Sequence, residues 1–221
     1  MFSNLEHLKL KAWGHKQHFS QFLPVNKKSQ IVDLGCGNGS LIYWLTTEGY
    51  ENVVGYDLSI QQISQGKQLG IENIFEKDVF EILQSEKKFD LIFARDLLEH
   101  FTKEEALRFL NLCSNRLNPH GVLILQIPNA GSPFFGRTRY GDFTHEIAFT
   151  QSSLSQIIKS TFESYSRISF YPWQPVVISF RSLVRYCVWR VFEFFYKIPL
   201  WAEHGGFNHI CTINLIAVVT K

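Results

Sequence analysis

The run at residues 31–40, Ile-Val-Asp-Leu-Gly-Cys-Gly-Asn-Gly-Ser, constrains this chain more than any other stretch. A short apolar segment ends around an acidic residue, glycines follow at positions 35, 37 and 39, and a helix-like segment at 41–47 begins at once. Glycines let the backbone turn sharply and approach a ligand closely. The following helix N-terminus offers free N–H groups and a positive dipole end to an anion. The run therefore predicts a strand, a ligand-binding glycine loop (residues 35–39) and a helix.

Dinucleotide-binding proteins use a similar glycine loop, but their spacing requires a third glycine at position 40. In this chain that position is Ser40, and the third glycine is Gly39. The chain also has no Tyr-x-x-x-Lys pair of the kind that reductases use. These differences disfavour an NAD-binding reductase, which stays as an alternative from another class of enzyme.

Acidic residues also mark the ends of the second and third predicted strands. The segment 52–59 is typical of a strand that ends at Asp57, eighteen residues past the last glycine of the loop. At that offset a carboxylate can accept from both ribose hydroxyls, whereas ordinary solvation of a strand end is the alternative. The segment 73–79 predicts a third strand followed by Asp78, which is placed either to accept from an adenine amino group or to cap the next helix.

Further strands are predicted at 89–96 and 122–128. Taken in order, these segments resemble the successive motifs of class I S-adenosylmethionine-dependent methyltransferases over residues 30–165. The resemblance implies S-adenosylmethionine as cofactor, S-adenosylhomocysteine as product, an adenine held between Leu58 and Val79, and no metal ion. The cofactor-binding residues that it implies are Asp33, Gly35, Cys36, Gly37, Gly39, Asp57, Leu58, Asp78, Val79 and Arg95.

The alternation of strands and helices predicts an α/β fold with a parallel sheet wound on both faces. Two more strands are expected at 164–171 and 209–220, and the family resemblance makes the last one antiparallel. The expected fold is a doubly wound, seven-stranded, mostly parallel, Rossmann-like methyltransferase sheet with a helical insertion before the last strand. The chain is expected to be one domain, made of an N-terminal helical segment or lid (1–29), a core (30–171), the insertion (172–208) and the last strand (209–221).

Composition fits a single domain with a small-molecule substrate. A chain of 221 residues can build one substantial core. The net charge of +2 gives no electrostatic case for nucleic acid. The four cysteines show no metal-ligand spacing and read as reduced thiols, and the N-terminus shows no secretory signal, so a cytoplasmic location is expected. Cys36 is interpreted as a small filler beside the cofactor.

The stretch 129–150, here called the acceptor loop, leaves the end of the fifth predicted strand and should line the acceptor side of the methyl donor. Loops this long inside a compact domain are usually functional. Its segment Gly-Asp-Phe-Thr-His at 141–145 resembles an Asp-x-Thr-His element found in methyltransferases of bacterial polysaccharide and sugar pathways. That resemblance implies a sugar or glycan-precursor acceptor, with another small molecule as the alternative.

The acceptor loop also supplies the catalytic candidates. His145 is the first choice of base for a hydroxyl acceptor, because imidazole titrates near neutrality, and Asp142 is placed to orient it. A hydrogen-bonded loop histidine is the alternative for His145, and simple packing at the start of a helix is the alternative for His100. The predicted substrate residues are Asn129, Arg137, Arg139, Tyr140 and His100.

Two helical segments lie outside the common core. Trp13, His15, His18, Phe19 and Phe22 recur at roughly helical spacing, which predicts a helix either over the cofactor pocket or packed on the sheet. The insertion predicts a helix at 176–198 with one apolar half and an opposite half that carries three arginines, one lysine and one glutamate. Its charges exclude a membrane span. A helix that covers the sheet or a homodimer partner is favoured, and a lid with weak, salt-sensitive contact to the inner face of a membrane is the alternative.

The resulting functional expectation is O-methylation of a small-molecule or glycan-precursor acceptor, in surface polysaccharide biosynthesis if the sugar resemblance holds. N-methylation of a small molecule and a binding subunit that has lost catalysis are the alternatives.

Overall fold

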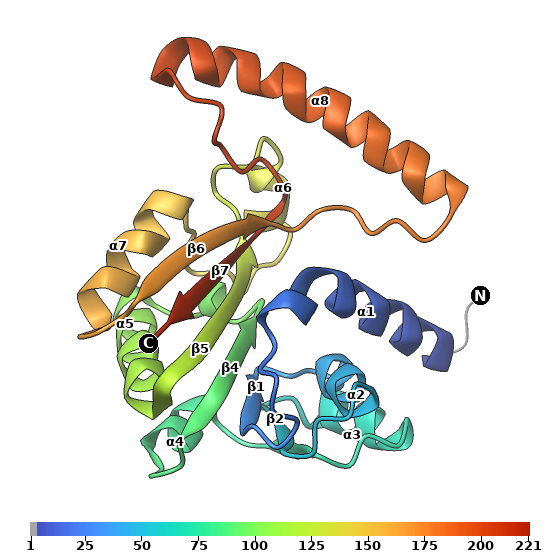
Figure 1. Cartoon of the computed structure of the whole chain (residues 1–221), viewed down its shortest axis with the longest axis vertical. Helices are drawn as coiled ribbons and strands as arrows, with labels where there is room; N and C mark the ends of the chain where they lie inside the picture. The colour runs from blue at the N-terminus through green and yellow to red at the C-terminus, as the bar shows by residue number, and fades with distance from the viewer. Residues whose placement is uncertain (1–3) are drawn as a thin grey trace.

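The computed structural model describes residues 4–221, which form a seven-stranded sheet with helices on both faces (Figure 1). The strand order is β3-β2-β1-β4-β5-β7-β6. Strands β1 to β5 pair in parallel, and β7 is antiparallel to both of its neighbours. The strands are β1 Ile31–Leu34, β2 Val53–Asp57, β3 Ile74–Glu76, β4 Phe89–Arg95, β5 Leu117–Pro128, β6 Arg167–Pro172 and β7 Asn214–Thr220. This topology confirms the predicted fold class.

The helices pack in two layers and leave a hydrophobic core on each face of the sheet. Their bounds are α1 Asn4–Phe19, α2 Ser40–Thr47, α3 Ile60–Gln68, α4 Val79–Gln84, α5 Lys103–Arg116, α6 Phe135–Arg139, α7 Gln151–Thr161 and α8 Phe180–His204, with 3-10 turns η1 Ser20–Phe22 and η2 Leu98–His100. Side chains alternate between the faces of a strand. Val32 and Leu34 therefore join the core under α4, α5 and α7, whereas Ile31 joins the core under α1, α2 and α3.

The same alternation brings two charged residues into the α1 face of the sheet. Asp33 shares its face with Ile31, and Arg95 shares its face with Phe93 of the neighbouring strand β4. Because β1 and β4 are parallel, their carboxyl ends meet at one edge, where ligands bind in sheets of this kind. The fold thus places the carboxylate of Asp33 and the guanidinium of Arg95 together beside the glycine loop.

The N-terminal segment forms α1, which lies beside α2 (Figure 1). Leu8, Ala12 and Phe19 are buried in the core on that face, and the rings of Phe19 and Phe93 meet edge-on with centroids 5.4 Å apart. The structure therefore shows α1 packed against the core. Closure over the cofactor stays a prediction.

Several predicted bounds differ from the observed ones. Strand β6 begins at Arg167 rather than 164, and β7 begins at Asn214 rather than 209. The acceptor loop contains the short helix α6. The insertion helix, expected at 176–198, begins at Phe180 because Ser179 and Ser182 form a reciprocal capping box. It then continues past Pro199 until Gly205, whose φ of 74° ends it.

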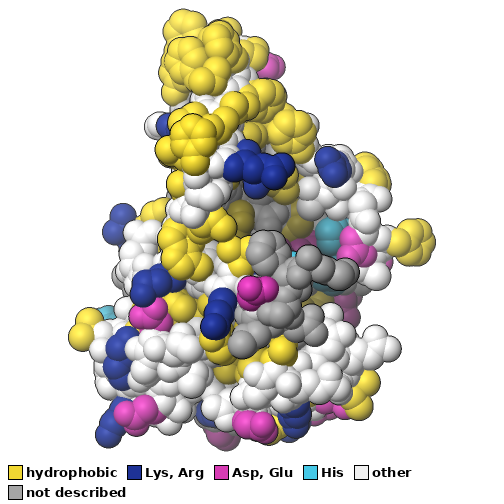
Figure 2. Space-filling view, turned by 90° about the vertical axis from the view of Figure 1, so that its right-hand side faces the viewer, with side chains coloured by type: hydrophobic (Ala, Val, Ile, Leu, Met, Phe, Trp, Pro, Cys, Tyr) yellow, Lys and Arg dark blue, Asp and Glu magenta, His cyan; other side chains and the backbone are white. Residues whose placement is uncertain are grey.

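Helix α8 turns its apolar half away from the sheet. Phe180, Val188 and Phe195 are 81%, 63% and 63% exposed, whereas Ser182 and Glu193 on the opposite half are buried. Figure 2 shows hydrophobic side chains gathered over the upper part of the molecule, where Figure 1 places α8. The favoured expectation that this helix covers the sheet is therefore wrong for its apolar half. The body of the protein instead faces the polar half, where Glu193 pairs with Arg190 and Lys197 at 2.7 and 3.0 Å.

Candidate functional site

The glycine loop adopts the backbone conformation that its sequence predicts. Gly35, Gly37 and Gly39 have φ values of 73°, 54° and 78°. Residues that carry a Cβ rarely adopt such positive φ values. The N–H groups of Gly35 and Cys36 both donate to the Tyr56 carbonyl in β2, at 2.8 and 3.0 Å. The loop is thus fixed against the end of the neighbouring strand.

Asp57 joins this loop to the next helix. Its Oδ2 accepts from the N–H of Gly37 at 2.7 Å, and its Oδ1 accepts from the N–H of Ser59 at 2.8 Å. Each carboxylate oxygen has a further lone pair for a ligand hydroxyl. Asp57 therefore lies where the ribose prediction requires it, although ribose binding itself stays a prediction.

A buried charged cluster lies on the α1 side of the loop. Asp33 is completely buried, and Arg95 Nη2 lies 3.3 Å from its Oδ2. His15 of α1 lies 3.4 Å from Arg95 Nη1 and 3.1 Å from the Ser40 hydroxyl through its Nε2. Burial raises the pKa of Asp33 to about 6 and lowers the pKa of His15 well below its usual value. Asp33 Oδ1 and Arg95 Nε have no hydrogen-bond partner within the described part of the chain.

The role of His15 in this cluster was missed from the sequence. The helical spacing of aromatic residues marked its helix but gave no signal that the ring meets Ser40 at the start of α2. Arg95 was predicted to bind cofactor, and the structure adds that it holds the buried Asp33 carboxylate.

The residues predicted to hold adenine lie at the ends of β2 and β3. Leu58 is 68% exposed, so its side chain is open to a ligand, whereas Val79, the first residue of α4, is buried in the core. Asp78 caps α4, because its Oδ1 accepts from the N–H of Phe80 at 2.7 Å. The capping alternative thus holds for one carboxylate oxygen, and an adenine contact through the other stays a prediction.

Cys36 fills space between the loop and β2. A Cβ added to Gly55 would lie 2.7 Å from Cys36 Cβ, so the two residues pack as closely as a glycine permits. Burial raises the pKa of the Cys36 thiol well above its usual value, and it is therefore neutral at physiological pH. These contacts agree with its interpretation as a filler.

On the acceptor side, the structure brings Asp142, Thr144, His100 and His145 together. The Thr144 hydroxyl donates to Asp142 Oδ1 at 2.7 Å and lies 2.9 Å from His100 Nδ1. The rings of His100 and His145 meet edge-on with centroids 4.9 Å apart. Asp142 thus reaches His100 through Thr144 rather than orienting His145 directly. His100 therefore contacts the acceptor loop from the end of η2, and its contact with substrate stays a prediction.

Glu99 is the residue that sequence reasoning missed here. It is 2% exposed, and its backbone carbonyl accepts from the N–H groups of Glu146 and Ile147, which ties the acceptor loop to η2. Burial, together with the charge of Asp96, raises the pKa of the Glu99 carboxyl to about 8. Its only sequence signal was its position next to His100, at the end of the fourth strand.

The predicted substrate residues are spread around the acceptor loop. Arg137 and Arg139 lie on α6, and Arg139 donates to the Glu146 carbonyl and lies over the exposed ring of Tyr140. Asn129 is buried, and both amide protons are used, because Nδ2 donates to the carbonyls of Ile210 and Thr212. Asn129 therefore has a structural role, and a substrate contact through its side chain can use only Oδ1.

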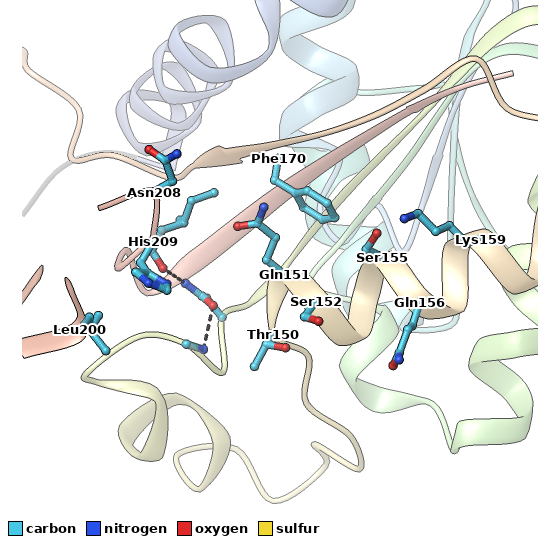
Figure 3. Close-up of a pocket in the computed structure, with 13 residues that line it drawn as sticks. Thr150, Gln151, Ser152, Ser155, Gln156, Lys159, Phe170, Leu200, Asn208 and His209 are labelled. Atoms are coloured by element: carbon cyan, nitrogen blue, oxygen red, sulfur yellow. Dashed lines mark hydrogen bonds between the residues drawn. The ribbon is translucent and has the colours of Figure 1, made fainter. Parts of the chain in front are cut away.

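A cavity of about 640 Å³ opens beside Asn129, between α7 and the segment that follows α8 (Figure 3). Gln151, Ser155 and Lys159 line it from α7, and His209 lines it from the opposite side. None of its lining residues belongs to the glycine loop. The cavity therefore adjoins the acceptor side and lies apart from the expected cofactor position.

The sequence matches the family model described as "Methyltransferase domain" over residues 7–172. The chain belongs to this family. The match covers both strand ends of the proposed cofactor site and the whole acceptor loop. With the sheet order, it confirms the prediction of a class I S-adenosylmethionine-dependent methyltransferase and sets aside the NAD-binding reductase.

The curated relatives that the chain matches include O-methyltransferases of ubiquinone biosynthesis. The chain is 28% identical over 104 residues to the ubiquinone biosynthesis O-methyltransferase of Rickettsia bellii (strain OSU 85-389), covering 45% of the chain and 42% of the relative. It is 28% identical over 106 residues to that of Rhodopseudomonas palustris (strain TIE-1), covering 45% and 40%. The chain thus spans about two fifths of the length of the curated relatives it matches. The predicted sugar-pathway branch and polysaccharide biosynthesis find no support in these relatives.

Solved structures share the fold. A SAM-dependent methyltransferase from Archaeoglobus fulgidus superposes with a TM-score of 0.71 at 17% identity, covering 97% of this chain and 94% of that one. The magnesium protoporphyrin IX methyltransferase of Synechocystis PCC 6803, solved with bound SAM, gives a TM-score of 0.54 at 17% identity, covering 98% and 80%. The predicted cofactor, S-adenosylmethionine, is thus present in a protein of this fold.

Proposed function

We propose that this chain transfers the methyl group of S-adenosylmethionine to a hydroxyl group of a small molecule. The observation that carries the proposal is the hydrogen bond from the N–H of Gly37 to Asp57 Oδ2, which joins the glycine loop to the acid of the next strand. This junction lies at the carboxyl ends of β1 and β2, where sheets of this type bind nucleotides. The family match supports the reaction, and the names of the curated relatives support oxygen as the methylated atom.

The cofactor fits this edge of the sheet with its ribose on Asp57 and its methionine end at the glycine loop. The free Oδ1 of Asp33 lies on the same side and suits the cofactor's ammonium group, because a buried carboxylate oxygen without a partner is costly. Leu58, Asp78 and Val79 are then the adenine contacts.

A hydroxyl acceptor is supported by the titratable groups of the acceptor side. A sulfonium methyl is already activated, so positioning supplies much of the rate acceleration. A hydroxyl oxygen is a weak nucleophile until it loses its proton, whereas the nitrogen of a neutral amine can attack before it loses one. Glu99, His100 and His145 form a group able to take up that proton, with His145 as the first candidate. Arg137, Arg139 and Tyr140 are the proposed contacts to the rest of the acceptor.

The acceptor is proposed to be apolar and held at a membrane surface. The apolar half of α8 is exposed. Arg181 and Arg185 lie on the other half but are also exposed, and they form no ion pair within the described part of the chain. Exposed apolar area beside free arginines suits the surface of an anionic bilayer. No helix in residues 4–221 is long and apolar enough to cross a membrane. From the exposed half of α8 we propose peripheral contact at the inner, cytoplasmic face of the membrane, and a homodimer through α8 is the competing outcome.

Thermal shift and product analysis test this function together. S-adenosylmethionine and its demethylated product should raise the midpoint of unfolding, whereas NAD should leave it unchanged. With labelled S-adenosylmethionine, a phenol bearing an alkyl chain should become labelled on oxygen, and the matching aniline should not. Stabilisation by NAD alone would contradict the assignment of S-adenosylmethionine as the cofactor. Label on the aniline nitrogen alone would contradict the proposal of a hydroxyl acceptor.

A further inference from the structure

Three side chains with metal-binding atoms lie together where the end of β4 meets the acceptor loop. Glu99 and His100 belong to η2, and His145 comes from the acceptor loop. Each offers one ligand atom, and these atoms all lie within 4.8 Å of one another. The three residues come from segments about 45 positions apart, joined by the hydrogen bonds from Glu146 and Ile147 to the Glu99 carbonyl.

One oxygen of the Glu99 carboxylate lacks a hydrogen-bond partner within the described part of the chain. Its Oε2 is buried and has no hydrogen-bond partner among residues 4–221, and no lysine or arginine of that range pairs with it. The carboxylates of Asp96 and Asp142 add further negative charge to its surroundings. An unpaired buried carboxylate is costly unless a cation or a proton balances it. Glu99 therefore offers an unused, buried ligand atom to a metal cation that displaces its proton.

The hydrogen bonds of His100 prepare it as a ligand. Because the Thr144 hydroxyl donates to Asp142, its oxygen accepts from His100, which makes Nδ1 the protonated ring nitrogen. The lone pair of the imidazole then lies on Nε2. A histidine held by a carboxylate on its far side is the usual arrangement around protein-bound metals. Here Thr144 relays the contact to Asp142.

We propose that Glu99, His100 and His145 bind a divalent transition-metal ion, with open positions for the acceptor hydroxyl. Two imidazoles and one carboxylate suit zinc, manganese or iron rather than calcium. Ligand atoms around such an ion are roughly 3.4 Å apart for bonds of about 2.1 Å. Because the ligand atoms all lie within 4.8 Å of one another, they must approach by at most about 1.4 Å, a change within reach of side-chain rotation. This proposal replaces the expectation that no metal is involved.

The inference rests on the proposed function for the place of the acceptor. A hydroxyl bound to such a cation loses its proton more readily, because the cation stabilises the oxyanion. The oxygen–methyl bond forms as the methyl–sulfur bond breaks, and the electron pair stays on sulfur to give S-adenosylhomocysteine. The hydroxyl proton passes to solvent. In the metal-loaded protein His145 is then a ligand rather than the base.

Metal binding can be measured without the reaction. The full chain is stripped with a chelator and titrated separately with Zn²⁺, Mn²⁺ and Mg²⁺ by calorimetry, and the Co²⁺ complex is followed by its visible absorption. One Zn²⁺ or Mn²⁺ should bind per chain, Mg²⁺ should bind more weakly, and Co²⁺ should show bands typical of nitrogen and oxygen ligands. His145→Ala and Glu99→Gln should each weaken Zn²⁺ binding at least about tenfold. His120→Asn, which changes an exposed histidine of β5 outside the acceptor loop, should leave it unchanged.

Two outcomes would overturn the proposal: no stoichiometric binding of any of these ions, or equal Zn²⁺ affinity in the wild type and His145→Ala. Because Glu99 is buried, its variant can fail to fold, and His145→Ala in the loop keeps the test decisive. A stripped enzyme that keeps full methyl transfer would end the metal proposal and leave the methyltransferase proposal intact. Failure to bind S-adenosylmethionine, with Zn²⁺ still bound at the three residues, would end the proposed function alone.

Discussion

At the scale of single residues, the buried carboxylate of Asp33 should make cofactor binding depend on pH. Burial raises its pKa to about 6, so the group is ionised above that pH and protonated below it. If its free Oδ1 holds the ammonium group of S-adenosylmethionine, binding requires the ionised form. Affinity should then fall by up to about tenfold per pH unit below pH 6 and stay level above it. Calorimetry between pH 5 and 8 measures this profile.

The variant Asp33→Asn separates this effect from other titrations. It removes the ionisable group and keeps a similar shape beside Arg95. The affinity of the variant should be lower at pH 7.5 and nearly flat from pH 5 to pH 8. A wild-type profile that is itself flat across pH 6 would show that Asp33 does not contact the charged end of the cofactor.

His145 should matter for turnover and not for cofactor binding. As base or as metal ligand it acts on the acceptor hydroxyl, so His145→Ala should lower kcat about a hundredfold or more. The affinity for S-adenosylhomocysteine should stay within about twofold of the wild type. His120→Asn serves as the control for removal of a histidine. A matching loss of cofactor affinity in His145→Ala would assign His145 a structural role instead.

At the scale of elements, α8 should carry the contact with membranes. Its outward half should insert apolar side chains at the interface, while Arg181 and Arg185 meet anionic headgroups. The protein should float with vesicles of anionic lipid at low salt and largely dissociate at high salt. The double variant Val188→Asp, Phe195→Asp should stay in solution at low salt. Val25→Ser, at another highly exposed apolar residue, should float as the wild type does.

Sedimentation of the same variants distinguishes the membrane from a second copy of the chain. If α8 mediates a dimer, the wild type sediments as a dimer without lipid, and Val188→Asp, Phe195→Asp is monomeric. A wild type that is dimeric and does not float at low salt would contradict the membrane proposal.

Some features of the helices and strands can be predicted from local sequence patterns, and others cannot. The end of β2 at Asp57, the acid that follows β3 at Asp78 and the glycine loop were predictable, because each depends on a short sequence segment. The direction in which α8 turns its apolar half was not, since a helical wheel defines two halves and does not say which one meets the body. Its end was also missed, because the pattern does not show that a helix continues past Pro199.

At the scale of the whole molecule, the unpredicted parts of the site come from contacts between distant segments. His15 of α1 contacts Ser40 of α2 and Arg95 of β4, and Glu99 of η2 contacts the acceptor loop. These contacts form only once the folded sheet has brought the elements to one edge. The seven-stranded, mostly parallel sheet with its antiparallel last strand was predictable from the alternation of elements and the family resemblance. The fold therefore follows from the sequence more fully than the chemistry of its acceptor side does.

The central claim is that S-adenosylmethionine binds where the glycine loop meets Asp57. Calorimetry of S-adenosylhomocysteine with the wild type, Asp57→Ala and the exposed control Glu51→Ala tests it most directly. Loss of a charge-assisted contact to both ribose hydroxyls should weaken binding at least about tenfold in Asp57→Ala and leave Glu51→Ala unchanged. Circular dichroism checks that the variant keeps its fold, since Asp57 also holds Gly37 and Ser59. Equal affinity in a folded Asp57→Ala and the wild type would contradict the claim.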